Sequence, residues 1–65
     1  MVEWYCDGAG WNGKYSAYCI VNKETGDHEL NPLPLEKTNN EMEYAAVIAA
    51  MQKAMQGDII LTDSQ

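Results

Sequence analysis

The chain has 65 residues, 46% of them hydrophobic, and its 10 acidic and 4 basic side chains give a formal net charge of −6. This length allows one domain, and the hydrophobic fraction argues against a disordered chain. The sequence contains no apolar run of the ~18 residues that a transmembrane helix needs. The four lysines are dispersed along the chain. No basic patch therefore indicates non-specific binding to nucleic-acid phosphates.

The N-terminal residues and the cysteines bear on the cellular compartment. Residues 1–4 lack the basic and long apolar regions of a signal peptide, which predicts a cytoplasmic protein. Cys6 and Cys19 are too few for a disulfide scaffold, and His28 has no metal-ligand spacing to either of them. We expect both cysteines to be small core residues rather than zinc ligands.

The first half of the sequence predicts three strands. Residues 2–7 and 14–21 are rich in aromatic and β-branched side chains, which favour strands. The glycines and asparagine of residues 8–13 predict a turn, and so short a connection predicts an antiparallel hairpin. Residues 28–36 form a weaker third strand. Its two prolines, two positions apart, are tolerable at the edge of a sheet.

The second half predicts a helix followed by a buried strand. Thr38 and Glu41 match the S/T-x-x-E capping box, so we expect a helix over residues 39–55 with residues 56–57 at its C-terminal cap. The continuous apolar run within residues 58–63 is typical of a parallel strand buried on both faces. The order ββ(β)αβ predicts an α/β fold with a right-handed crossover through the helix.

Three carboxylates are predicted to converge at one edge of this sheet. Asp7 closes the first strand and Asp63 closes the last. If these strands are parallel neighbours, both side chains lie at the carboxyl edge, where open α/β sheets bind ligands. Glu43, near the start of the crossover helix, is expected to face partly inward. Three converging acids repel one another unless cations bind, and Mg²⁺ or Mn²⁺ prefers such oxygen ligands.

The same three acids also have ordinary structural explanations. Asp7 before Gly8 fits turn chemistry, and Asp63 at a strand end can cap a following helix. Glu43 fits the preference for acidic side chains near a helix N-terminus, which the helix dipole favours. Spacing alone leaves the metal site and these explanations open.

The acids lie in three short motifs whose order and spacing resemble those of the type 1 ribonuclease H family. The motifs are Asp7-Gly8-Ala9, then Thr38-Asn39-Asn40-Glu41-Met42-Glu43-Tyr44-Ala45-Ala46, and last Thr62-Asp63-Ser64-Gln65. The resemblance implies a single partial domain over residues 1–65, equivalent to the first half of the family's domain. It also implies a ribonuclease H-like mixed sheet, truncated to ββ(β)αβ, with strand order 3-2-1-4 and one crossover helix.

The resemblance further implies a metal-dependent endonuclease that hydrolyses the RNA strand of RNA–DNA hybrids. Asp7, Glu43 and Asp63 match the family's first three metal-binding carboxylates, which implies Mg²⁺ or Mn²⁺ as the cofactor. Glu43 would also approach the RNA 2′-hydroxyl, which distinguishes RNA from DNA. Five further residues match contacts to the hybrid: Asn39, Asn40 and Gln65 in the minor groove, and Gly10 and Asn12 along the RNA backbone.

Other features leave a second function open. The family's fourth carboxylate and basic handle have no match here, and His28 does not match its histidine loop. The chain then acts as an oligomer or with a C-terminal half, or it is a non-catalytic ribonuclease H-like module that binds nucleic acid or self-assembles. An exposed edge at residues 58–63, or an uncovered sheet face, predicts a homodimer or higher oligomer. Trp11 either stacks on a sugar or covers the core.

Overall fold

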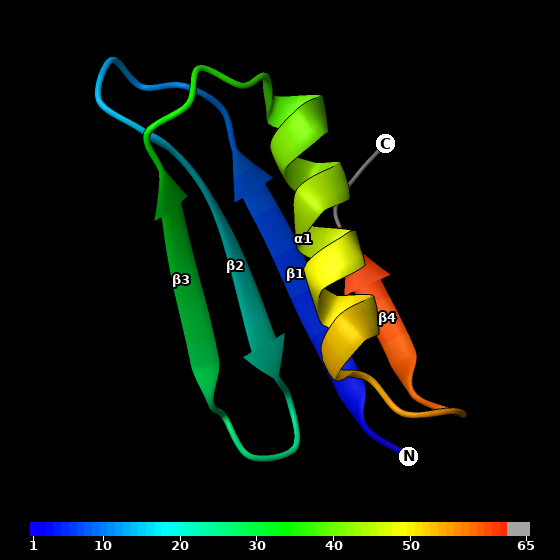
Figure 1. Cartoon of the computed structure of the whole chain (residues 1–65). Coiled ribbons are helices and arrows are strands. Elements are labelled where there is room, and N and C mark those ends of the chain that lie inside the picture. Colours follow the sequence, from blue (N-terminus) through cyan, green and yellow to red (C-terminus); the bar gives the residue numbers. More distant parts are fainter. Residues whose placement is uncertain (63–65) are drawn as a thin grey trace.

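A computed structural model describes residues 1–62 and shows a four-stranded sheet with one helix lying across one face (Figure 1). The elements in chain order are β1 (Glu3–Ala9), β2 (Ser16–Asn22), β3 (His28–Leu33), α1 (Asn39–Lys53) and β4 (Ile59–Thr62). The sheet has the order β3-β2-β1-β4, which confirms the predicted α/β fold. Within residues 1–62, no helix is long and apolar enough to cross a membrane.

The pairing of the strands makes the sheet mixed, as predicted. β1 runs antiparallel to β2, from Trp4 opposite Asn22 to Ala9 opposite Ala17. β2 runs antiparallel to β3, whereas β1 and β4 are parallel and connected through α1. Because β1 and β4 are parallel, their carboxyl ends lie at the same end of the sheet, together with the N-terminus of α1 (Figure 1).

β3 lies at the predicted edge of the sheet but is shorter than expected. It ends at Leu33, so Pro32 lies within it, opposite Ala17, and Pro34 lies beyond it. The prediction of a strand over residues 28–36 is therefore wrong for its last three residues. The physical reason is that proline has no N–H to continue the ladder, and the chain then turns so that the Leu35 carbonyl accepts a hydrogen bond from the Ser16 hydroxyl at 2.7 Å.

The core forms where α1 packs on the central strands. Its buried members are Cys6 and Ile20 from the sheet and Ala46 and Ala50 from the helix. These alanines allow a close approach between helix and sheet. Met42 of α1 is also buried, whereas Tyr44, Ile48 and Met51 are exposed, as is Met55 beyond the helix. The sheet therefore covers one side of a helix whose sequence is apolar on most sides.

The C-terminal end of α1 differs from the prediction. The helix ends at Lys53 with Ala54 as its cap, and not at Met55. Met55 instead begins a turn that its carbonyl closes by accepting a hydrogen bond from the Asp58 N–H at 3.0 Å. Gly57 has a φ of +92°, a conformation that favours glycine, so it serves this turn rather than a helix cap.

Candidate functional site

The predicted functional residues that the structure describes gather at one end of the molecule. Three segments meet there: the carboxyl end of β1 with the loop at residues 10–15, the connection at residues 34–38, and the first turns of α1 (Figure 1). The turn at residues 23–27 and the C-terminal end of α1 lie at the opposite end. The candidate site therefore occupies one end of the molecule, and the polar side chains of the opposite end serve as a comparison.

β1 and α1 touch at Gly8, which fixes where two of the acids lie. A Cβ atom on Gly8 would lie 2.3 Å from the Met42 carbonyl carbon and 2.4 Å from the Glu43 nitrogen. Only a residue without a side chain permits this contact between a strand and a helix backbone. Because Asp7 precedes Gly8, the contact brings the backbones of Asp7 and Glu43 into the same region.

Asp7 points to the side of the sheet away from α1. Gly8 faces the helix, and neighbouring residues of a strand point to opposite faces. The Asp7 side chain is exposed, and one carboxylate oxygen accepts a hydrogen bond from the Gly8 N–H at 2.9 Å. Glu43 is half-buried in the first turns of α1. Asp7 thus keeps carboxylate oxygens accessible for a ligand.

The third predicted carboxylate, Asp63, lies outside the described residues, as does Gln65. The described pairing of β1 with β4 ends at Cys6 opposite Thr62. In the sequence, the next residues after this pair are Asp7 and Asp63. Within residues 1–62, the structure contains no group of three or more His, Cys, Asp or Glu side chains that could hold a metal ion.

The loop after β1 is tied to the start of α1. The Gly10 N–H donates to Asn39 Oδ1 at 2.6 Å, and the Trp11 N–H donates to the Lys37 carbonyl at 2.8 Å. A Cβ atom on Gly10 would lie 2.8 Å from the Asn39 nitrogen, so the fit requires glycine here as well. The structure therefore brings Gly10 and Asn39, two of the predicted hybrid contacts, side by side.

The hydrogen bonds of Asn12 and Asn39 orient their side-chain amides. Asn12 Oδ1 accepts from the N–H groups of Lys14 and Tyr15, both at 2.9 Å, and so shapes the loop. Since the oxygens of Asn12 and Asn39 face N–H donors, their NH₂ groups are the ends left to donate to a ligand. Asn40 is exposed beside Asn39. The sequence alone did not predict that the side-chain oxygen of Asn12 shapes the loop.

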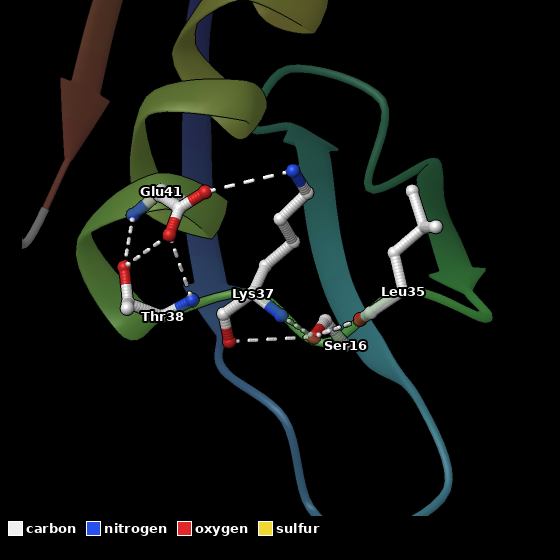
Figure 2. A network of polar contacts seen from close by, with 5 residues as sticks. All are labelled: Ser16, Leu35, Lys37, Thr38 and Glu41. Carbon is white, nitrogen blue, oxygen red and sulfur yellow. Dashed lines mark hydrogen bonds and ion pairs between the residues drawn. The ribbon is translucent and has the colours of Figure 1, made fainter.

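A polar network holds the segment that leads into α1 (Figure 2). Ser16 is fully buried; its hydroxyl donates to the Leu35 carbonyl at 2.7 Å and accepts from the Lys37 N–H at 3.1 Å. The predicted capping box is present, with Thr38 Oγ1 accepting from the Glu41 N–H at 3.1 Å. The reciprocal bonds from Thr38 lower the pKa of Glu41.

Comparison with known proteins identifies the family. A ribonuclease H family model matches residues 1–65, the whole chain. The chain belongs to the ribonuclease H family. No curated protein and no solved structure matches it.

In this ribonuclease H chain, the cysteines and the histidine are distributed as core and surface residues. Cys6 is buried, its thiol lies 3.5 Å from the Leu61 carbonyl, and burial raises its pKa. Cys19 is half-buried on the face opposite α1, beside Asp7 in the pairing. His28 is exposed at the start of β3. The expectation of core packing is confirmed for Cys6, and Cys19 is only partly buried.

Proposed function

We propose that this chain contributes to a metal-dependent endonuclease that hydrolyses the RNA strand of RNA–DNA hybrids. The observation that carries the proposal is the contact at Gly8, which brings the backbones of Asp7 and Glu43 into the same region at the carboxyl end of β1. The parallel neighbour β4 runs toward this same end and is followed in sequence by Asp63. Family membership supplies the class of reaction and of substrate.

The donor chemistry of these residues fits a hard divalent cation. Asp7 offers an exposed carboxylate with one neighbouring N–H donor, and Glu43 offers a half-buried carboxylate in the first turns of α1. We propose that Asp7, Glu43 and Asp63 hold Mg²⁺, with Mn²⁺ as a substitute, since both prefer oxygen ligands. When bound, such a cation activates water and stabilises the leaving oxygen of a phosphodiester.

Binding of the hybrid is assigned to polar groups around this end. With a net charge of −6 the chain repels phosphates, so neutral donors and bound cations carry more of the contact than lysines do. The amide NH₂ groups of Asn12 and Asn39 are positioned by the loop itself. We assign Asn39, with Asn40 and Gln65, to contacts in the wide minor groove, where Glu43 approaches a 2′-hydroxyl. Asn12 and Gly10 are assigned to the RNA backbone.

A second candidate is a ribonuclease H-like module that binds hybrids or self-assembles without cleaving them. Among the described strands β4 is an edge, with Ile59 41% exposed, and Leu30 on the face opposite α1 is 63% exposed. Apolar side chains at an open edge and an uncovered sheet face favour association of two copies. Sedimentation that finds a stable monomer at micromolar concentration would contradict this candidate's self-assembly.

Cleavage of an end-labelled RNA–DNA hybrid in Mg²⁺ and in Mn²⁺ tests the enzymatic proposal. An Asp7→Asn protein, purified identically, reveals any contaminating nuclease. Asp27→Asn is the matched control, because this acid is exposed in the turn at the opposite end. Cleavage by the parent and by Asp27→Asn, but not by Asp7→Asn, would support the proposal. Equal cleavage by all three proteins, or no cleavage by the parent, would leave the non-catalytic module.

A further inference from the structure

Trp11 lies at the predicted site end, and the proposed chemistry does not use it. Its side chain is 39% exposed although it is large and apolar. Its backbone N–H donates to the Lys37 carbonyl at 2.8 Å, and the next residue before it, Gly10, is bonded to Asn39. The indole is therefore carried by a loop that these two hydrogen bonds join to Lys37 and to the first residue of α1.

An open cleft of about 610 Å³ lies between Trp11 and that segment. Its walls are formed by residues 10–11 on one side and by residues 36–39 on the other. Two of these residues, Gly10 and Asn39, are the contacts assigned to the hybrid above. The polar network around Ser16 and the capping box set the position of the second wall (Figure 2).

The charges around the cleft decide which part of a nucleotide fits it. Glu36 lines the cleft and repels a phosphate. The ammonium of Lys37 lies 3.6 Å from the Glu41 carboxylate, which offsets its charge. An uncharged sugar suits these walls better: the indole covers its apolar face, the Glu36 carboxylate accepts from a hydroxyl, and the Asn39 NH₂ donates to an oxygen. Base faces are stacked inside a duplex, whereas ribose rings line its wide minor groove.

We propose that this cleft receives a ribose of the RNA strand, with Trp11 packed on the sugar and Glu36 accepting a hydrogen bond from one of its hydroxyls. Trp11 is then a substrate-positioning residue at the same end of the molecule as Asp7 and Glu43, and it does not touch the scissile bond. The inference rests on the proposed hybrid-binding function, and it adds an aromatic sugar contact to that function.

Binding is measured by fluorescence anisotropy of a labelled RNA–DNA hybrid, in EDTA at low salt. It is repeated in Mg²⁺ for samples whose RNA stays intact on a gel. Trp11→Ala raises the Kd roughly tenfold, in the range of an aromatic contact to one nucleotide, and Trp11→Tyr raises it less than about threefold. Met55→Ala is the matched control, because Met55 is 78% exposed at the opposite end of the molecule. Its Kd equals that of the parent.

Tryptophan fluorescence keeps the inference testable even if the alanine variant fails to fold. Hybrid binding should change the emission of the parent, and Trp11→Phe should abolish that change. Trp4 would then remain as the emitter, and its indole N–H is bonded to Asp58 far from the cleft. A Kd for Trp11→Ala equal to that of the parent, or an emission change that persists in Trp11→Phe, would overturn ribose binding in the cleft. Either result would leave the proposed function standing. A parent that binds the hybrid no better than a DNA duplex overturns both.

Discussion

Two aspartates at opposite ends of the β1–β4 pair are used in opposite ways. Asp58, just before β4, accepts hydrogen bonds from the N–H groups of Val2 and Met55 and from the indole of Trp4, at 2.9–3.0 Å. Asp7, near the carboxyl end of β1, accepts from the adjacent Gly8 N–H and is exposed. The N-terminus, β1 and the α1–β4 turn are thus joined through one carboxylate, whereas Asp7 joins no distant segments within residues 1–62.

This difference separates a structural acid from a candidate catalytic one. A carboxylate whose lone pairs are taken by several N–H donors has little left to give a metal ion. Those donors hold the pKa of Asp58 below its usual range, with the Met55 N–H contributing most and the bonds from Trp4 and Val2 next. Of these two acids, Asp7 is the one whose carboxylate oxygens remain accessible. The same Asp→Asn change should therefore lower activity at Asp7 and lower stability at Asp58.

Asp7→Asn is the change with the largest expected effect on activity. Removing a metal-binding carboxylate should lower hybrid cleavage at least about 100-fold. The thermal midpoint should stay within about 2 °C of the parent, because an exposed side chain with one local hydrogen bond contributes little to stability. Cleavage assays and thermal denaturation on the same preparations check this. A large drop in Tm would make Asp7 a structural residue like Asp58.

Gly8→Ala should damage both the fold and the site. The new Cβ would lie 2.3 Å from the Met42 carbonyl carbon, so β1 and α1 must separate. We expect a loss of about 1–3 kcal/mol or more in the free energy of unfolding, as for an overpacked core, together with loss of cleavage. Chemical denaturation measures the first effect.

A glycine in open space provides the control for that substitution. Gly13 has a φ of +97° and no neighbouring atom within 4 Å of an added Cβ. Gly13→Ala should cost about 1 kcal/mol from backbone conformation alone and should spare the contact between β1 and α1. Equal losses for both variants would contradict the importance of the close approach at Gly8.

Asp58→Asn should act on stability and on its pH dependence. The amide has one carbonyl oxygen in place of two carboxylate oxygens, so we expect Tm to fall by roughly 5 °C. Because the folded-state pKa is lowered, the stabilisation is fully present above the unfolded value near 3.8 and is lost as the pH falls through the folded pKa. The parent should therefore lose Tm below about pH 4 more steeply than the variant. If Tm falls equally with pH in the parent and in Asp58→Asn, the Asp58 carboxylate does not stabilise the junction of the N-terminus, β1 and the α1–β4 turn.

The same contrast explains what the sequence could predict. The start of α1 was predictable because the capping box of Thr38 and Glu41 is a local pattern. The end of α1 was not, because the Asp58 carboxylate accepts a hydrogen bond from the Met55 N–H across the turn at residues 55–58. Ser16 gave no signal either, since its buried hydroxyl bonds to a segment about twenty residues away. Local motifs located Asp7 and Glu43, but the contact that relates them depends on the packing of Gly8.

Thr38→Ala should have the smallest effect and tests how firmly the site end is fastened. The substitution removes the hydroxyl that accepts from the Glu41 N–H, which should cost about 1 kcal/mol of stability. Thr38→Ser keeps the oxygen and should restore most of it. Because Asn39 follows the cap and binds the Gly10 N–H, fraying of this turn should also weaken hybrid binding more than the stability loss explains. Equal hybrid affinity for the alanine and serine variants would show that the loop after β1 keeps its position without the cap.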